Sequence, residues 1–349
     1  MIFNLLKTAG VDAALITSQY TALYFTGYKN PDCCIFVTPD KCYYLTDARY
    51  TNEARKAIPS IFEVIDAGKQ FAKTVQNLTA AHKVKRLGLE LGSLTYANYK
   101  QYEELFEGVK FFDICDNIAK IRITKTESEL ALIQEACNIT DRTFSRVLGE
   151  IKEGISELEL AYRLQLLLVQ EGGEGISFDT ICVFGENTAN PHGHPSSRQL
   201  KYGDPITLDF GAIHKGYCAD LTRSFSFGKP TEEYIKVYNI VKEANELAIK
   251  GLFAGITGAQ ADGISRKVIE DYGYGSYFLH SLGHGVGVEV HEKPYLAKSS
   301  VDILDNNMVF SIEPGIYTGK FGVRIEDLVT IKDSKAVVLS HSDKKLIII

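Results

Sequence analysis

Two stretches of the sequence combine the alternating apolar pattern of a β-hairpin with acidic residues inside the arms. The first, ITLDFGAIHKGYCADLTRSF at residues 206–225, carries Asp209 and Asp220. The second, FSIEPGIYTGKFGVRIEDLV at residues 310–329, carries Glu313 and Glu326. Like charges that lie close together on a sheet destabilise it unless something positive lies between them. The chain must therefore fold so that these acidic residues either lie apart from one another or share a positive group.

The turn of the first hairpin predicts how its two arms pair. A two-residue turn at His214-Lys215 would pair Ile213 with Gly216. In that register Asp209 faces Asp220 directly, with Cβ atoms about 4.5–5.5 Å apart. A bulge at Gly216 would slip the register by one residue and leave the two aspartates as diagonal neighbours.

The second hairpin has glycine first in its expected turn, Gly319-Lys320, which is typical of a type II′ turn. Thr318 then pairs with Phe321, and the same register places the two glutamates of this hairpin opposite each other. A single carboxylate pair could lie on a solvated sheet face. Two pairs with apolar neighbours favour burial, and four buried carboxylates need compensating cations. Two divalent metal ions would supply that charge; oxygen ligands suit Mn, and Zn or Co is also tolerated.

A nitrogen ligand could complete such a site. The segment HSLGHGVGVEVHEKP, at residues 280–294, carries three histidines, and one of them, His284, lies between two glycines where the backbone can approach a metal closely. A polar loop, GENTANPHGHPSSR at residues 185–198, adds His192 and His194. The glycine-rich GHGVG segment is not a phosphate loop, because the sequence contains no G-x-x-x-x-G-K-[ST] motif.

These motifs resemble those of the metallopeptidase family that includes methionine aminopeptidase, prolidase and aminopeptidase P. Five positions match the family's metal ligands in order and chemical type: Asp209, Asp220, His284, Glu313 and Glu326. The resemblance implies that Asp209 binds one metal ion and that Asp220 and Glu326 bridge both ions. It implies that His284 and Glu313 hold the other ion.

The resemblance also implies roles for residues beside the metal ions. His192 and His291 would orient the substrate and stabilise the developing oxyanion. Glu313 would carry the proton to the leaving nitrogen. Strand alternation places Arg324 on the same face of its strand as Glu326, as a partner of another site residue or as a contact to substrate. Two ions that share a water can lower its pKa towards about 7, which provides hydroxide for attack on the peptide carbonyl.

The resemblance covers the whole chain and implies an α+β protein of two domains. Residues 1–122 would form the smaller creatinase-like N-terminal α/β domain. Residues 123–349 would form the pita-bread catalytic domain, a pseudo-symmetric antiparallel sheet covered by helices. For the first domain the patterns predict strands within 12–17, 33–38, 42–47 and 86–90, and helices within 49–58 and 95–106.

Capping motifs predict where the helices of the second domain begin. Thr126 with Glu129 and Ser156 with Glu159 have capping-box spacing, and the second of these helices should end at Gly172-Gly173. A third helix is expected at 231–252, and paired strands are expected at 178–184, 205–225, 308–317 and 322–331.

Methionine aminopeptidases lack the N-terminal domain, so the resemblance favours the branch that acts on Xaa-Pro bonds. The favoured activity is an Xaa-Pro aminopeptidase that acts on short peptides with proline at the second position. The alternative is an Xaa-Pro dipeptidase, or prolidase. A creatinase-like hydrolase or a non-catalytic binding homologue is more remote, because those relatives lack metal ligands that are complete here. Proline offers no N–H, so an apolar pocket for its ring must select it.

Composition and charge limit the classes of partner and the cellular location that are expected for this chain. A formal net charge of −6 gives no reason to expect nucleic acid or an anionic membrane as a partner. No apolar run approaches the length of a bilayer span, and the N-terminal segment lacks the pattern of a secretory signal. The seven cysteines are odd in number and include no C-x-x-C pair, which favours reduced thiols in a cytoplasmic protein. The family resemblance implies a homodimer.

Overall fold

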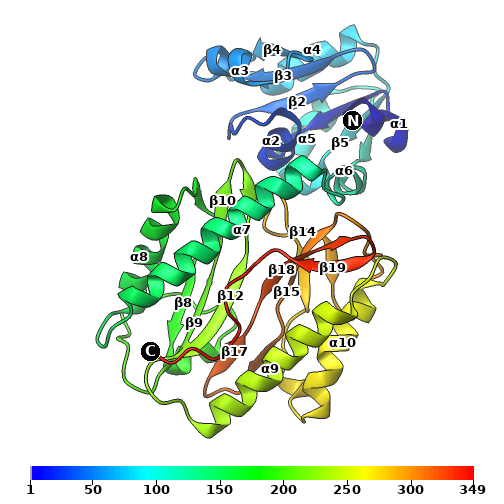
Figure 1. The fold of residues 1–349 in the computed structure, drawn as a ribbon. Coiled ribbons are helices and arrows are strands. Elements are labelled where there is room, and N and C mark those ends of the chain that lie inside the picture. Colours follow the sequence, from blue (N-terminus) through cyan, green and yellow to red (C-terminus); the bar gives the residue numbers. More distant parts are fainter. Residues whose placement is uncertain (1) are drawn as a thin grey trace. The chain divides into compact units, whose positions relative to one another are not determined.

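The computed structural model describes residues 2–349, and the chain passes from one compact unit to a second between Arg122 and Ile123. Each unit has hydrophobic clusters of its own. The N-terminal unit contains the elements α1–α6 and β1–β6, and the second unit contains α7–α10 and β7–β19 (Figure 1).

The N-terminal unit is built on one mixed sheet of six strands in the order β4-β3-β2-β1-β5-β6. Its central strands are short apolar segments that are buried throughout, which explains why the sequence pattern located them. The strands are β1 Ala13–Ile16, β2 Cys34–Val37, β3 Cys42–Thr46, β4 Phe62–Asp66, β5 Arg86–Leu89 and β6 Lys110–Asp113. The helices are α1 Ile2–Ala9, α2 Gln19–Thr26, α3 Thr51–Ala57, α4 Phe71–Ala81, α5 Tyr96–Leu105 and α6 Cys115–Arg122.

The second unit contains the two acidic hairpins and four main helices. The helices are α7 Glu127–Val147, α8 Glu157–Gln170, α9 Glu232–Gly251 and α10 Gly258–Asp271. The strands before the second helix pair are β7 Gly175–Ile176, β8 Ile181–Phe184, β9 Pro205–Phe210, β10 Ala212–His214, β11 Tyr217–Cys218 and β12 Leu221–Ser226. Those after it are β13 Gly283–Gly285, β14 Glu292–Leu296, β15 Val309–Ile312, β16 Gly315–Tyr317, β17 Gly322–Arg324, β18 Asp327–Lys332 and β19 Lys335–Val338.

The helices begin where side chains cap their free N–H groups. Thr126 and Glu129 form the predicted capping box of α7, and Thr231 caps α9. Ser156 caps α8 by accepting the N–H of Glu159 at 3.1 Å. The capping box predicted for α8 is incomplete, because the Glu159 carboxylate pairs with Arg163 instead, at 2.8 Å.

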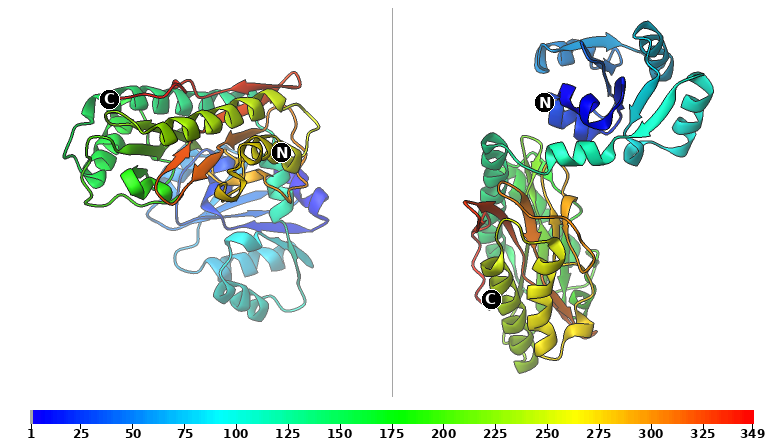
Figure 2. Two further views of the ribbon diagram at one scale, coloured as in Figure 1. Left: turned by 90° about the horizontal axis from the view of Figure 1, so that it is seen from below. Right: turned by 90° about the vertical axis from the view of Figure 1, so that its right-hand side faces the viewer.

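Each helix pair packs on its own set of strands. One cluster joins α7 and α8 to β8, β9 and β12, through residues such as Phe144, Leu164, Leu208 and Phe225. Two further clusters join α9 and α10 to the strands of the second hairpin. In both views of Figure 2, α7 and α9 lie on the same face of the strands. The opposite face is therefore free of these helices.

The first hairpin has a different register from the predicted one. Its turn is Lys215-Gly216, both residues have positive φ, and Ile213 pairs with Cys218. Asp209 lies opposite Thr222, so the expectation that it faces Asp220 directly is wrong. The physical reason is that Gly216 takes the left-handed conformation inside the turn and does not pair with Ile213. The shift is two residues, and the period of a strand is two, so both aspartates still lie on one face.

The second hairpin has the predicted register. Thr318 donates its N–H to Phe321 at 2.9 Å across the Gly319-Lys320 turn, and Gly319 has a φ of 82°. Strands β15 and β18 and strands β16 and β17 keep the same register on both sides of Glu313 and Glu326. The expectation that these two glutamates face each other is confirmed.

Both hairpins are interrupted beside their acidic residues. In the first, Gly211 separates β9 from β10, and a Cβ atom there would lie 1.8 Å from the carbonyl oxygen of Ala219. Only glycine permits that approach. In the second, Glu313-Pro314 and Ile325-Glu326 lie between the paired strands. The hairpins are joined to each other by the N–H of Glu326, which donates to Thr222 O at 3.1 Å.

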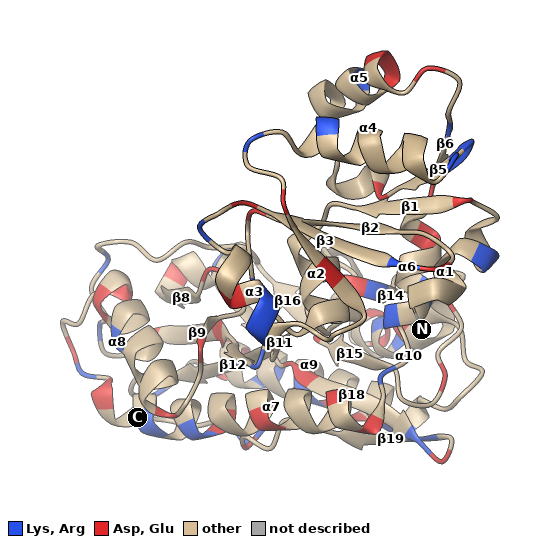
Figure 3. Cartoon of the chain, turned by 90° about the horizontal axis from the view of Figure 1, so that it is seen from above, with Lys and Arg blue, Asp and Glu red and all other residues tan. Residues whose placement is uncertain are grey.

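The outer faces of the helices are charged. Acidic and basic residues are interspersed along α7 and α8 in Figure 3, and Arg142, Arg146 and Arg163 form ion pairs there. Exposed pairs of this kind contribute little to stability. All seven cysteines are free thiols, as predicted. None of the helices within residues 2–349 has the length and hydropathy of a bilayer span.

The first hairpin turn yields a prediction about stability. Lys215 is exposed and has a φ of 47°, a conformation that asparagine adopts more readily than lysine. We expect Lys215→Asn to raise the free energy of unfolding by about 0.5–1 kcal/mol, measured from the shift in the urea midpoint. Lys229→Asn, which changes an exposed lysine without a positive φ, is the control and should leave the midpoint unchanged. Equal shifts for both variants would contradict this explanation.

Candidate metal centre

The residues singled out from the sequence surround one cavity in the second unit. Its volume is about 320 Å³. It is lined by all eight predicted site residues: Asp209, Asp220, His284, Glu313, Glu326, His192, His291 and Arg324. It is also lined by residues that sequence reasoning did not assign to the site, including Phe178, Ile181, His280 and Tyr295. The structure thus brings every predicted site residue together.

Successive side chains on a strand point to opposite faces of the sheet. The acidic residues lie on the face that lines the cavity. Asp209 on β9 and Arg324 on β17 line the cavity, and Thr222 on β12 hydrogen-bonds to both Arg324 and Glu326. The neighbouring side chains Leu208 and Phe210 belong to the core beneath α7 and α8. A half-buried strand with period two therefore separates an apolar face from a polar one.

Three side chains meet closely enough to share one cation. Ligand atoms of Asp220, His284 and Glu326 all lie within 4.8 Å of one another. The Nε2 atom of His284 lies 3.6 Å from Asp220 Oδ2 and 3.4 Å from Glu313 Oε1. The other ring nitrogen, Nδ1, lies 3.2 Å from the carbonyl oxygen of Gly285. Because that carbonyl can only accept, Nδ1 carries the proton and Nε2 presents its lone pair to the carboxylates.

The cavity holds more negative than positive charge. Four carboxylates line it against a single guanidinium. Burial, followed by repulsion from Glu326 and Asp209, raises the pKa of Asp220 well above its usual value. Burial, followed by repulsion from Glu313 and Asp209, does the same to the pKa of Glu326. Burial raises the pKa of Glu313 to about 8, with Arg324 opposing the shift. One guanidinium does not balance four carboxyl groups, so three of them keep their protons to an unusually high pH when no cation is bound.

Two buried carboxylate oxygens at the site lack a hydrogen-bond partner among the described residues. They are Asp209 Oδ1 and Glu326 Oε1. A buried carboxylate oxygen without a partner costs free energy, which a bound cation would recover. The donor set, four carboxylates and one imidazole, is one that Mn, Co and Zn accept. The residues present therefore fit a divalent metal site.

Arg324 is fixed by side chains and backbone around it. It is 4% exposed and forms a short ion pair with Asp209 Oδ2. It also donates to Thr222 Oγ1 at 3.0 Å and to the hydroxyl of Tyr317 at 2.7 Å. Of the two roles considered for Arg324, these contacts support that of a partner to another site residue. Tyr317 and Thr222 carried no signal in the sequence, since each reads as an ordinary strand residue.

Three histidines lie around the carboxylates. The rings of His291 and His284 have centroids 4.3 Å apart. Burial lowers the pKa of His284 to about 4, and burial also lowers the pKa of His291, with Asp209 opposing that shift. His280 Nε2 lies 3.0 Å from the Tyr317 hydroxyl, and burial lowers the pKa of His280 to about 3. These rings are neutral at physiological pH, which is the form that binds metals and donates one N–H. His192 is exposed at the cavity.

The sequence matches two known protein families, one in each unit of the chain. The sequence pattern of Metallopeptidase family M24 matches residues 131–333, and that of the Creatinase/Prolidase N-terminal domain matches residues 2–124. The chain belongs to metallopeptidase family M24. This confirms the resemblance that the hairpin motifs indicated, and with it the two-domain architecture of a creatinase-type α/β domain and a pita-bread catalytic domain.

Several proteins named as Xaa-Pro peptidases are similar to three quarters or more of the chain. It is 40% identical over 262 residues to the Xaa-Pro dipeptidase of Pyrococcus furiosus, covering 75% of each sequence. The structure of an Xaa-Pro dipeptidase from Bacillus anthracis matches with a TM-score of 0.95 and 35% identity over 99% of both chains. The X-Pro aminopeptidase from Thermotoga maritima MSB8 matches with a TM-score of 0.91 and 35% identity, over 99% of this chain and 100% of the other.

The raised pKa of Glu313 predicts how the metal-free M24 enzyme responds to pH. A carboxyl group that binds its proton more tightly in the folded state stabilises the fold below about pH 4.5 and loses that contribution as the pH rises to about 8. We therefore expect Glu313→Gln to raise the thermal midpoint of the chelator-treated protein at pH 9. The gain should be about 2–4 °C for each kcal/mol of repulsion removed, and it should vanish near pH 5.

The matched control is Glu153→Gln, which removes an exposed carboxylate from the same unit. Its thermal midpoint should follow that of the wild type at every pH. A gain for Glu313→Gln that is the same at pH 5 and pH 9 would show that repulsion is not its cause.

Proposed function

We propose that this M24 enzyme is a metal-dependent Xaa-Pro dipeptidase. The observation that carries the proposal is the convergence of four carboxylates and one unprotonated imidazole nitrogen on a single cavity with excess negative charge. The dipeptidases of Pyrococcus furiosus and Bacillus anthracis support the substrate assignment. The complete set of acidic residues and His284 argues against a creatinase-like hydrolase without metal and against a non-catalytic homologue.

Five residues are proposed to hold two divalent metal ions. Asp209 would bind one ion, His284 and Glu313 would bind the other, and Asp220 with Glu326 would bridge them. Glu326 already presents an oxygen without a hydrogen-bond partner, and so does Asp209. Mn suits a set dominated by carboxylates, with Co or Zn as alternatives. When bound, such a pair supplies a nucleophile at neutral pH and a Lewis acid for the peptide carbonyl.

Proton transfer and stabilisation of the substrate carbonyl oxygen are proposed to be carried out by side chains of the protein. Glu313 has a pKa of about 8 without metal, and it lies within 3.4 Å of His284, at the centre of the site. A carboxyl group with this placement can take a proton from the attacking water and deliver it to the leaving nitrogen. His291, beside His284, and His192, at the cavity, are proposed to donate N–H groups to the substrate carbonyl as negative charge develops on its oxygen.

Selection of proline is proposed to depend on apolar contacts. The proline nitrogen of an Xaa-Pro bond has no N–H, so hydrogen bonding cannot recognise it. Phe178 and Ile181 provide apolar surface on the cavity wall, and Tyr295 adds an aromatic ring that is 47% exposed. These side chains are candidates for the surface that contacts the pyrrolidine ring.

The sequence motifs favoured an aminopeptidase over a dipeptidase, and the comparisons favour the dipeptidase. The cavity size agrees with the second choice. A volume of about 320 Å³ is enough to hold a two-residue substrate. Manganese as the physiological metal, a homodimer and a cytoplasmic location stay proposals that follow from the sequence.

Substrate length tests the proposal directly. The metal-free protein would be reconstituted with Mn, Co or Zn and assayed with an Xaa-Pro dipeptide, an Xaa-Pro-Yaa tripeptide and an Xaa-Ala dipeptide. We expect kcat/KM for the Xaa-Pro dipeptide to exceed that for the tripeptide at least tenfold, with no cleavage of the Xaa-Ala dipeptide. Faster cleavage of the tripeptide would identify an Xaa-Pro aminopeptidase, and cleavage of none of the three would refute both.

A charge-removing substitution tests the metal assignment. Asp220→Asn removes one negative charge at nearly constant shape, and Asp220 is 5% exposed. We expect loss of activity by at least 100-fold and a lower content of bound metal, with the circular dichroism spectrum unchanged. Full activity with both metal ions retained would exclude Asp220 as a ligand.

A further inference from the structure

Behind the proposed metal centre, one buried amide on helix α9 contacts the backbone of both glutamate-bearing strands. Asn245 is fully buried. Its Nδ2 group donates to the carbonyl oxygen of Ile312 at 2.8 Å and to that of Ile325 at 3.3 Å. Ile312 directly precedes Glu313, and Ile325 directly precedes Glu326. We propose that Asn245 is a positioning residue that fixes both glutamates of the metal centre, an inference that rests on the proposed function.

The strands need this amide because their ladder is incomplete at this point. Ile325 donates its N–H to the carbonyl oxygen of Pro314 at 3.4 Å. In a regular antiparallel pair the opposite residue returns a hydrogen bond, but Pro314 has no N–H. The carbonyl oxygen of Ile325 would therefore be left without its ladder partner in a buried place. The side chain of Asn245 supplies the missing donor.

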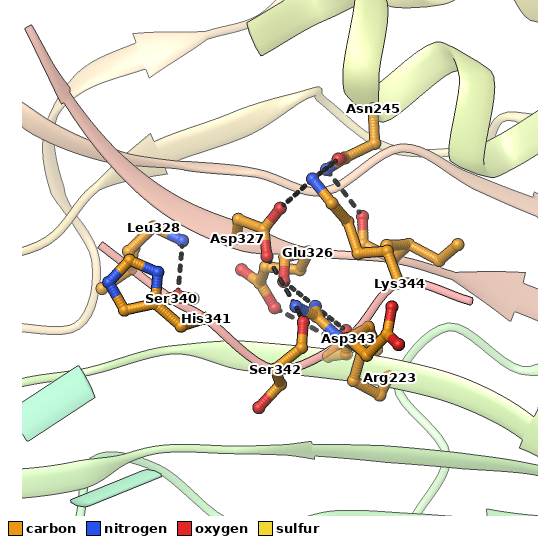
Figure 4. A network of polar contacts seen from close by, with 12 residues as sticks. Arg223, Asn245, Glu326, Asp327, Leu328, Ser340, His341, Ser342, Asp343 and Lys344 are labelled. Atoms are coloured by element: carbon orange, nitrogen blue, oxygen red, sulfur yellow. Dashed lines mark hydrogen bonds and ion pairs between the residues drawn. The ribbon is translucent and has the colours of Figure 1, made fainter. Parts of the chain in front are cut away.

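Asn245 is itself held by a lysine that belongs to a buried network of charged residues, as Figure 4 shows. Its Oδ1 atom accepts from Lys344 Nζ at 3.0 Å, and Lys344 also pairs with Asp327 Oδ2 at 2.7 Å. Asp327 Oδ1 accepts from Arg223 Nη2 at 2.7 Å. These three charged residues lie on the side of the strands that faces away from the cavity.

The same network also contacts the peptide group that follows Glu326. Arg223, which is 1% exposed, donates a short hydrogen bond from Nη1 to the carbonyl oxygen of Glu326. The carbonyl before Glu326 is therefore held by Asn245, and its own carbonyl is held by Arg223. With both neighbouring peptide groups fixed, the Glu326 side chain leaves the backbone in one direction, towards the cavity.

The first half of the domain has a related contact. On α7, the buried hydroxyl of Thr140 accepts the N–H of Ala212 at 3.0 Å, beside the interruption of the first hairpin. Thr140 follows the N-cap Thr126 by the same number of residues as Asn245 follows the N-cap Thr231. Each helix thus places one buried polar side chain at the interrupted hairpin beneath it. This recurrence favours a role at the hairpin over an incidental buried amide.

Metal affinity is the quantity that this role should change. Substitution of groups that hold metal ligands in place typically lowers affinity by about 10–100-fold. The test uses the full chain, freed of metal and titrated with Co²⁺ alone by calorimetry and by visible absorption. We expect Asn245→Ser, whose side chain is too short to reach both carbonyls, to weaken Co²⁺ binding at least tenfold and to alter the absorption bands. At saturating Co²⁺, kcat should fall more than KM changes.

The matched control is Tyr238→Phe on the same helix. Tyr238 donates to the carbonyl oxygen of Lys344 at 3.2 Å, so this variant also removes a contact from α9 to the C-terminal segment. It leaves both isoleucine carbonyls with their donors. We expect Co²⁺ affinity within twofold of the wild type, even if thermal stability falls as much as for Asn245→Ser.

The outcomes separate this inference from the proposed function. If the wild type binds no Co²⁺, the proposed metal centre is wrong. If the wild type binds Co²⁺ and Asn245→Ser binds it with the same affinity and spectrum, Asn245 has only a structural role and the inference is overturned. Should Asn245→Ser fail to fold, Asn245→Asp, which keeps the size and the contact to Lys344, decides by the same criterion.

Discussion

Repulsion among four carboxylates in one cavity is the interaction on which the rest of the catalytic unit depends. Each of these groups has been moved out of water, and burial together with the neighbouring charges makes ionisation costly for Asp220, Glu313 and Glu326. The protein supplies one guanidinium, Arg324, and the hydroxyl of Thr222. Without metal, protons offset part of this charge, since the pKa values of these carboxyl groups are raised. Divalent cations bound as proposed would replace those protons and stabilise the ionised site.

Acidic side chains that repel one another stay close together only if the backbone that carries them is rigid. The two related halves of the domain provide that rigid backbone. Each half lays a long helix with a threonine cap on one face of an acidic hairpin. The face beneath the helix is apolar, and the other face carries the carboxylates, because the strand period separates them. The buried charges Arg223 and Asp327 are exceptions on the helix side, and each hydrogen-bonds into the network that surrounds Glu326. Their placement links the helix side of the strands to Glu326, one of the proposed metal ligands.

The sequence predicted the acidic residues and histidines that line the cavity. It did not predict several residues that hydrogen-bond to them or to their backbone. Residues whose type is unusual for their surroundings were found, since an aspartate such as Asp209 in an apolar strand is conspicuous. The register of the first hairpin was missed because Lys215 adopts a positive φ that lysine rarely takes, which propensity does not anticipate. Tyr317, Thr222 and Asn245 were missed because their chemistry depends on partners distant in the sequence, and no local pattern distinguishes them from ordinary core residues.

The strict register of the second hairpin has a consequence for chemistry. Glu313 and Glu326 face each other where the ladder is interrupted, and Pro314 causes part of that interruption by removing a donor. A regular ladder would hold the two strands at a fixed separation, whereas the interruption lets Asn245 and Arg223 set the backbone positions from outside the sheet. Side chains from a helix and a neighbouring strand would thus set the distance between the two glutamates that are proposed as metal ligands. In the proposed centre, a metal pair held by these residues would depend on that distance to supply an activated water.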